Sequence, residues 1–234
     1  MIDTAAPPPV TRADTPLRAI VFDLDDTLVD QVTASGAAVV AWAATLGVTG
    51  PDVPGRWAAL SERHYARYQQ REITFSGQRR ERVREFLAAD LSDAEADGLF
   101  AGYLERYEAG WTVFGDAIPA LRRVRAAGLT VAVLTNGDEG QQRRKLDRLG
   151  LAPEIDLMVA SSSLPAGKPD PRAYRHVVDL LGVDAGAALM VGDSLVKDVR
   201  GALAAGLPAV LLDRFDAHPT TDVRRIRTLD ELTF

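Results

Sequence analysis

Short apolar runs alternate with amphipathic stretches over much of the chain. Apolar runs rich in β-branched residues predict buried strands at residues 19–22, 130–134, 157–160, 188–191 and 209–212. Helical patterns cover residues 117–127, 139–149, 171–181 and 196–205, and several of them stop at a glycine. Strands that alternate with helices are typical of βαβ units, so the pattern predicts an α/β core built on a parallel sheet.

The alternation is interrupted once, between about residues 31 and 107. Helical patterns occur there instead, at residues 33–46, 56–70, 79–89 and 93–108. Ten of the 15 aromatic residues lie between Trp42 and Trp111, so this segment has the apolar bulk for a core of its own. We predict a helical domain, residues 31–109, inserted into an α/β core domain formed by residues 17–30 and 110–234.

Composition narrows the possible functions. The 234 residues are 47% hydrophobic and 26% charged, as in an ordinary globular protein. The absence of cysteine excludes disulfides, thiolate metal ligands and a cysteine nucleophile. A net charge of −6 argues against a nucleic acid polymer or an anionic membrane as partner. Residues 1–16 lack the pattern of a secretory signal, so we expect a disordered leader on a cytoplasmic protein. The composition fits a monomer or a homodimer.

Polar residues follow three of the predicted strands at their carboxyl ends, where ligands bind in open α/β sheets. Several carboxylates at one place repel each other unless a cation neutralises them, and Mg²⁺ prefers oxygen ligands beside a phosphate. An ammonium and a hydroxyl would complement phosphoryl oxygens, and one carboxylate could act as nucleophile. The candidate residues are Asp23 and Asp25, then Thr135 and Asn136, then Lys168 in a loop, and finally Asp193, Ser194 and Asp198.

Each of these segments, taken alone, is also typical of a turn, a helix cap or a surface loop. The functional interpretation depends on their joint occurrence, in order, each at the carboxyl end of a strand. Lys168 stands out because the chain has 24 Arg and only 3 Lys. The same bias does not distinguish Lys145 or Lys197, which we interpret as surface charges.

Together the segments resemble the four motifs of haloacid dehalogenase-superfamily hydrolases. The resembling segments are Asp23-Leu24-Asp25-Asp26-Thr27, residues 131–137 ending in Thr135-Asn136-Gly137, Gly167-Lys168-Pro169-Asp170, and Gly192-Asp193-Ser194 with Asp198. The resemblance covers about residues 18–215. It implies a Rossmann-like three-layer core with strand order 5-4-1-2-3, and it identifies the insertion as a helical cap of the first type. The cap would hinge near residues 29–32 and 109–115 and close over the site.

The resemblance also implies catalytic roles. Asp23 would be the nucleophile that forms an aspartyl-phosphate. Asp25 would protonate the leaving alkoxide and then activate water. Thr135, Asn136 and Lys168 would bind the phosphoryl group.

A magnesium ion is part of the same implied arrangement. Its ligands would be the Asp23 carboxylate, the Asp25 backbone carbonyl and Asp193. Asp198 and Ser194 would lie outside them, with Asp198 ordering Lys168 or a metal-bound water.

The second aspartate distinguishes the possible reactions. Dehalogenases of this superfamily lack it because a halide leaves without a proton, so Asp25 favours hydrolysis of a small-molecule phosphate monoester. The alternatives are a phosphomutase with the same nucleophile, a 2-haloacid dehalogenase and a non-catalytic binding protein. Residues 135–146 are similar to the branch that contains acylneuraminate-9-phosphatases and pyrimidine-nucleotide phosphatases.

The inserted segment could contact the rest of the substrate. Arg79, Arg80 and Arg82 follow the loop at residues 75–78, and we hypothesise that one of them contacts an anionic or polar leaving group. The alternative is a solvated helix face in which arginines pair with nearby glutamates.

Overall fold

The computed structural model describes residues 15–234, so the expected leader at residues 1–16 lies outside the described residues except for its last two. A six-stranded sheet has the order β3-β2-β1-β4-β5-β6, and all of its pairings are parallel. The predicted α/β class and strand order are confirmed, with β6 added at one edge. The strands are β1 Ala19–Phe22, β2 Thr130–Thr135, β3 Leu157–Ala160, β4 Ala188–Gly192, β5 Ala209–Leu212 and β6 Arg225–Ile226.

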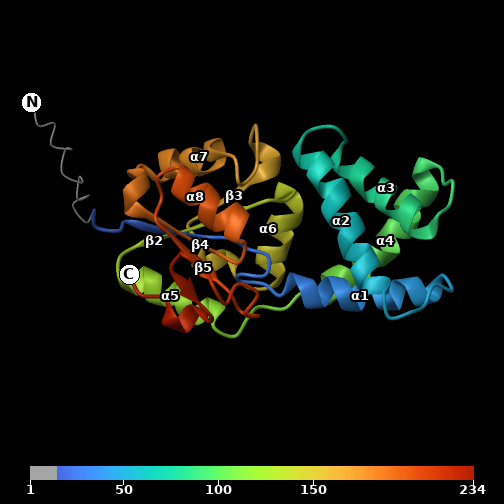
Figure 1. Ribbon diagram of the computed structural model, residues 1–234, viewed down its shortest axis with the longest axis horizontal. Coiled ribbons are helices and arrows are strands. Elements are labelled where there is room, and N and C mark those ends of the chain that lie inside the picture. The colour runs from blue at the N-terminus through green and yellow to red at the C-terminus, as the bar shows by residue number, and fades with distance from the viewer. Residues whose placement is uncertain (1–14) are drawn as a thin grey trace, which may run out of the picture.

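Helices cover both faces of the sheet and form the outer two of three layers (Figure 1). Alternate strand residues such as Ile20 and Val21 point to opposite faces, and both are fully buried. This two-sided burial explains why the strands are continuous apolar runs. On one side lie α5 Ala117–Ala126 and α6 Glu139–Arg148, and on the other lie α7 Pro171–Leu181 and α8 Gly201–Ala204.

Short helical turns complete the α/β core. The single helix expected at residues 196–205 is a π-helical segment, Leu195–Arg200, that leads into the short α8. The 3₁₀ turns are Ala152–Glu154, Ser161–Ser163, Ala185–Ala187 and Leu229–Glu231. No helix among residues 15–234 is both long and apolar enough to cross a membrane.

Four helices form a separate unit beside the carboxyl ends of the strands, and we call this unit the cap (Figure 1). It consists of α1 Gln31–Thr45, α2 Val53–Gln69, α3 Phe75–Leu87 and α4 Asp93–Ala109. Its own core is aromatic, with Trp42, Trp57 and Phe86 in mutual contact. The two chain segments that join it to the sheet bridge each other at Val29 and Val113, so both connections leave at one point.

Candidate active site

Three strand ends bring the candidate residues of the α/β core together. Asp23 follows β1, and its backbone N–H donates to the carbonyl oxygen of Val191 in β4 at 2.9 Å. Asp193 follows β4, and its N–H donates to the Thr27 hydroxyl at 3.1 Å. Thr135 ends β2, and its side chain is buried. Because β1 lies between β2 and β4, the three segments meet at one edge of the sheet.

Lys168 lies at the centre of this group. Its ammonium donates to Asp23 Oδ1 at 2.5 Å and to Asp198 Oδ1 at 2.6 Å, and the side chain is buried. Burial opposes the charged form, but attraction to Asp198 and Asp23 raises the pKa of Lys168. Lys168 therefore stays protonated where phosphoryl oxygens would need a positive charge.

Asn136 fixes the backbone that carries this lysine. Its Nδ2 donates to the Lys168 carbonyl oxygen at 2.7 Å, and its Oδ1 accepts from the Lys168 N–H at 2.8 Å. Both polar atoms of the amide are thus engaged with one peptide unit. The geometry makes Asn136 a residue that positions Lys168, and its predicted contact with phosphate stays a prediction.

The carboxylates form a cluster suited to a hard cation. Oxygen atoms of Asp23, Asp193 and Asp198 all lie within 4.8 Å of one another. Burial, together with the negative charge of Asp198, raises the pKa of Asp193 to about 7, and burial also raises the pKa of Asp23. When all three carboxylates are ionised, one ammonium leaves two negative charges without compensation, and the raised pKa values of Asp23 and Asp193 reflect this in part. A divalent cation with oxygen ligands fits both this charge and this donor set.

Asp198 and Ser194 act within the loop that follows β4. Asp198 Oδ2 accepts from the Ser194 N–H at 2.9 Å, while its other oxygen holds Lys168. The Ser194 hydroxyl accepts from the Lys197 N–H at 3.2 Å and caps the π-helical segment. Asp198 therefore orients the central lysine, and Ser194 shapes the loop that carries Asp193.

Asp25 is held by two residues of α6. Lys145 donates to Asp25 Oδ1, and Gln142 Nε2 donates to Asp25 Oδ2 at 2.9 Å and to the Thr135 hydroxyl at 3.0 Å. The interpretation of Lys145 as a surface charge is wrong, because its side chain is only 1% exposed. The signal was its helical phase: Lys145 and Gln142 share a face with the apolar Leu146.

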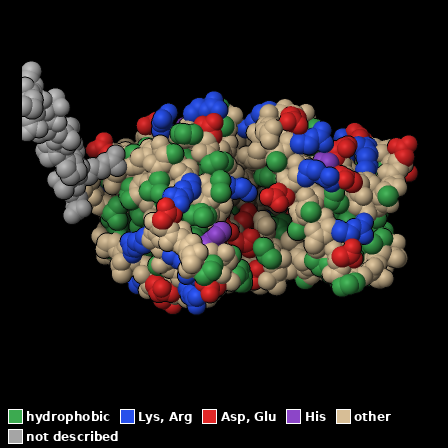
Figure 2. Space-filling model, viewed as in Figure 1, with side chains coloured by type: hydrophobic (Ala, Val, Ile, Leu, Met, Phe, Trp, Pro, Cys, Tyr) green, Lys and Arg blue, Asp and Glu red, His purple; other side chains and the backbone are tan. Residues whose placement is uncertain are grey.

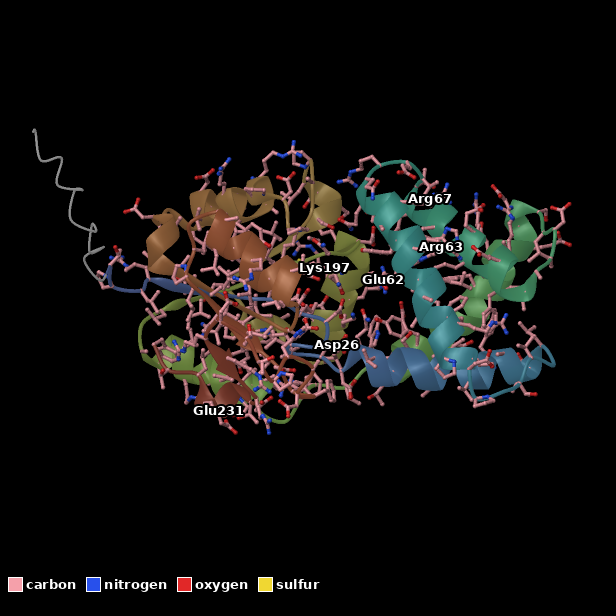
Figure 3. The ribbon with its side chains drawn as sticks, in the orientation of Figure 1. Asp26, Glu62, Arg63, Arg67, Lys197 and Glu231 are labelled. Carbon is pink, nitrogen blue, oxygen red and sulfur yellow. The ribbon has the colours of Figure 1, made fainter. Side chains whose placement is uncertain are left out.

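The loop between Asp25 and the cap has a strained turn. Asp26 has φ 61°, and its carboxylate accepts from the N–H groups of Gln31 and Val32 at 3.0 and 2.9 Å. Burial raises the pKa of Asp26 to about 6. In Figure 3 this residue lies where α1 leaves the core, so it supports the start of the cap.

The cap contacts the core beside these residues. Tyr65 on α2 donates through its hydroxyl to the Asn136 carbonyl oxygen at 3.0 Å, and Gln69 Nε2 donates to Ser161 Oγ at 3.1 Å. Acidic side chains are visible in the hollow between the two units (Figure 2). The cap thus lies directly over the loops that hold Asn136 and Lys168.

The three candidate arginines of the cap lie in different surroundings. Arg80 pairs with Asp93 and Asp97 of α4, which is the alternative of a solvated helix face paired with acidic residues, so the geometry does not favour it as the substrate contact. The geometry does not favour Arg82 either, because its guanidinium packs inside the cap, 4.3 Å from the Trp57 ring centroid.

Arg79 alone of the three reaches across to the core. Its Nη2 donates to Gln141 Oε1 at 2.7 Å, next to the Gln142 that holds Asp25. Its guanidinium lies 4.2 Å from the ring centroid of Phe75, and burial lowers its pKa. The helical phase of α3 explains the difference, since successive residues point in different directions.

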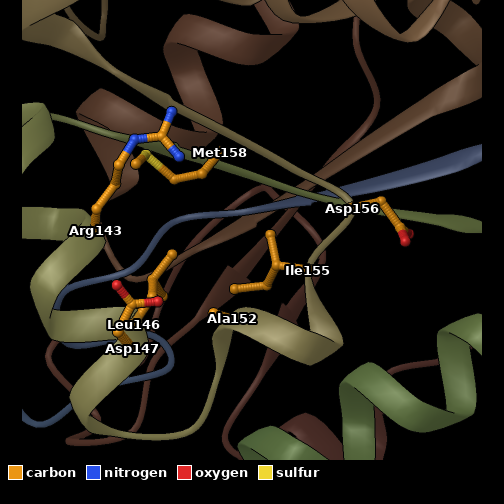
Figure 4. A pocket seen from close by; sticks show the side chains of 7 residues that line it. All are labelled: Arg143, Leu146, Asp147, Ala152, Ile155, Asp156 and Met158. Atoms are coloured by element: carbon orange, nitrogen blue, oxygen red, sulfur yellow. The ribbon is translucent and has the colours of Figure 1, made fainter.

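A surface pocket lies elsewhere (Figure 4). It is lined by α6, by the turn after it and by the start of β3, and its apolar residues are Leu146, Ala152, Ile155 and Met158. The start of β3 lies at the amino ends of the strands, whereas the carboxylate cluster lies at their carboxyl ends. This pocket therefore lies away from the carboxylate cluster.

Comparisons with known proteins agree with this geometry. A family model described as haloacid dehalogenase-like hydrolase matches residues 17–206. The chain is 34% identical over 224 residues to phosphoserine phosphatase of Thermus thermophilus, a match that covers 85% of this chain and 89% of that one. It is 34% identical over 99 residues to N-acylneuraminate-9-phosphatase of Mus musculus, covering 42% and 40% of the two chains. The crystal structure of the HAD-hydrolase YfnB from Bacillus subtilis, bound to magnesium, matches with a TM-score of 0.76 at 22% identity over 93% of this chain and 97% of that one.

Proposed function

The chain belongs to the haloacid dehalogenase-like hydrolases, and from this premise we propose that it is a Mg²⁺-dependent phosphatase of small phosphate monoesters. The observation that supports this most directly is the second carboxylate, Asp25, which Lys145 and Gln142 hold close to Thr135. An alkoxide leaving group needs a proton donor at this place, whereas a halide does not. Asp25 therefore favours phosphate ester hydrolysis over dehalogenation.

The proposed reaction has two steps. A carboxylate oxygen of Asp23 attacks phosphorus, the bond between phosphorus and the ester oxygen breaks, and Asp25 gives its proton to that oxygen. In the second step Asp25 takes a proton from water, whose oxygen attacks phosphorus and releases phosphate and the free Asp23 carboxylate. Lys168 holds phosphoryl oxygens beside Asp23, and the Thr135 hydroxyl, oriented by Gln142, donates to another.

The carboxylates of Asp23 and Asp193 would hold Mg²⁺, with the Asp25 backbone carbonyl as a further ligand. When bound, the ion neutralises the charge of the carboxylates and of the phosphoryl group. Asp198 is engaged by Lys168 and by the Ser194 N–H, so it orients the lysine in preference to binding the ion. Lys168 and the bound ion would together supply the positive charge that the phosphoryl group needs.

Arg79 is the cap residue that we propose for the leaving group. Within residues 15–234 no carboxylate forms an ion pair with Arg79, and its guanidinium is partly desolvated beside Phe75. Such a guanidinium suits a carboxylate or a second anionic group on the substrate. We expect Arg79→Gln to raise KM for esters with such a group, while Arg80→Gln, on the same helix but paired with α4, leaves KM unchanged.

The deciding experiment is phosphate release from a panel of monoesters: carboxylate-bearing esters, sugar phosphates and nucleoside monophosphates. It is run with Mg²⁺, with chelator and with Asp23→Asn. Release that needs the metal and is lost in the variant supports the phosphatase. Retained activity in Asp23→Asn contradicts the proposed nucleophile. A folded protein that releases little phosphate but moves a phosphoryl group between sugar positions would be the alternative phosphomutase. The cytoplasmic location and the monomeric or homodimeric state stay predictions.

A further inference from the structure

Lys145 is a buried cation whose contact with Asp25 has no stated part in either step of the proposed reaction. Its helix, α6, is otherwise rich in polar residues, and its neighbours Arg143 and Arg144 are exposed. The phosphoryl group is served by Lys168, which pairs with Asp23 and Asp198. Lys145 instead pairs with Asp25 and lies beside two aromatic residues near the end of the cap.

We propose that Lys145 is a positioning residue for the general acid, and that it acts on the leaving-group proton transfer through Asp25. This inference rests on the proposed phosphatase function. It assigns Lys145 no contact with the phosphoryl group and no proton of its own in the reaction. Its task is to hold the Asp25 carboxyl in one orientation.

The geometry around Asp25 supports an orienting role. Lys145 engages Oδ1 and Gln142 engages Oδ2, so both oxygens of the carboxyl have a fixed partner. The two partners are three residues apart on one face of α6, so a single helix sets the position of both. Gln142 also donates to the Thr135 hydroxyl at 3.0 Å, which ties the carboxyl of the acid to a phosphate-binding group.

The cap completes the surroundings of the ammonium. Lys145 Nζ lies 3.4 Å from the Tyr107 hydroxyl and 5.1 Å from the ring centroid of Trp111. Tyr107 lies in the last turn of α4, the last helix of the cap, and Trp111 lies in the chain that returns to the core. Both residues are buried, so they shield the pair formed by Lys145 and Asp25 from water and strengthen it. The acid is therefore oriented by a residue that the cap covers.

A positioning residue of this kind has a specific kinetic signature. An alkyl phosphate needs a proton on its leaving oxygen, whereas the nitrophenolate of p-nitrophenyl phosphate leaves without one. Misorientation of Asp25 should lower kcat/KM for the alkyl ester by on the order of 10²-fold, the scale of general acid catalysis, and much less for the aryl ester. We compare kcat/KM because it reports the departure of the leaving group, whereas kcat also includes the later attack of water, which both esters share.

The test compares wild type, Lys145→Met, Asp25→Asn and the double variant on both esters with Mg²⁺. The ratio of the two kcat/KM values within one sample does not depend on the fraction of folded protein, so partial unfolding of Lys145→Met does not affect it. Arg143→Met is the matched control, since it removes an exposed cation from the same helix. Hydrolysis by the wild type that is lost in Asp23→Asn checks the parent function separately.

We expect Lys145→Met to lower the alkyl-to-aryl ratio in the same direction as Asp25→Asn, and Arg143→Met to leave it unchanged. The double variant should lose no more than Asp25→Asn alone, because Lys145 acts through Asp25. An equal loss of kcat/KM on both esters, or losses that add in the double variant, would overturn the proposal in an otherwise active enzyme and leave the phosphatase standing.

Discussion

Gly192→Ala tests how tightly the end of β4 packs against the site. A methyl group on Gly192 would lie 2.4 Å from Asp198 Cγ and Oδ2, and 2.5 Å from its Cβ. Ordinary contacts of this kind are 3.4–4 Å, so Asp198 must give way by about 1 Å. Asp198 is 1% exposed and bonded to Lys168 and the Ser194 N–H, so it has no free space to enter.

The cost follows from these contacts. Overpacking a close-packed site costs about 1–3 kcal/mol. Loss of the hydrogen bond between the Lys168 ammonium and Asp198 adds about 1.5–3 kcal/mol, since both partners are charged. We expect a loss of about 4 kcal/mol in the free energy of unfolding, which lowers Tm by on the order of 10 °C for a chain of this size. Displacement of Lys168 by about 1 Å should also lower kcat by about 10²-fold.

Gly98→Ala is the matched control. Gly98 lies exposed within α4, and a methyl group there meets no atom within 4 Å. The free energy of unfolding of this variant should rise by about 0.5–1 kcal/mol, because glycine inside a helix carries an entropic cost. Thermal unfolding followed by circular dichroism, with phosphate release at 25 °C, measures both effects. If Gly192→Ala melts no lower than wild type and keeps its activity, the reasoning about Asp198 is refuted.

Three further predictions concern the metal, the cap and the core. The pKa of Asp193 is raised to about 7 in the folded chain. The free energy of unfolding of the metal-free protein should therefore fall as pH rises from about 4 to 7, because over this range the folded cluster must give up a proton that the unfolded chain has already lost. Mg²⁺ binds the deprotonated cluster, so it should raise Tm more at pH 8 than at pH 5; an equal gain at both values would contradict this linkage. Tyr65→Phe removes the hydrogen bond to the Asn136 carbonyl oxygen, so it should weaken the contact between cap and core by about 1 kcal/mol. We expect faster amide exchange at that contact, with Tm nearly unchanged. Arg214→Met leaves the half-buried Asp116 carboxylate without the guanidinium that donates to both of its oxygens. We expect the free energy of unfolding, measured with urea, to fall by about 2 kcal/mol. An unchanged urea midpoint would show that the pair contributes nothing.

The strands could be predicted from the sequence because both faces of the sheet are covered. Residues such as Ile20 and Val21 are buried on opposite sides, so each strand is a continuous apolar run that needs no knowledge of its partners. β6 was missed because its two residues, Arg225 and Ile226, are too few to form a pattern. Asp23, Thr135 and Asp193 each come at the carboxyl end of a predicted strand. Because the sheet was predicted to be parallel, the three residues were expected at one edge.

The cap shows the limit of this reasoning. Arg79, Arg80 and Arg82 are close together and chemically identical, yet one reaches Gln141, one pairs with α4 and one packs on Trp57. Composition and spacing treat the three as equal. Only the docking of α3 against its neighbours decides which of them faces the core.

The sequence by itself determined the α/β class and, through four short motifs, the chemistry that the core can perform. Local periodicity and strand ends are properties of neighbouring residues, so they can be read along the chain. The tertiary structure alone decided that Lys145 is buried against Asp25 and covered by Tyr107 and Trp111. Asp25 lies 120 positions before Lys145, and the stability of a buried charge depends on such distant partners and on the water that they exclude.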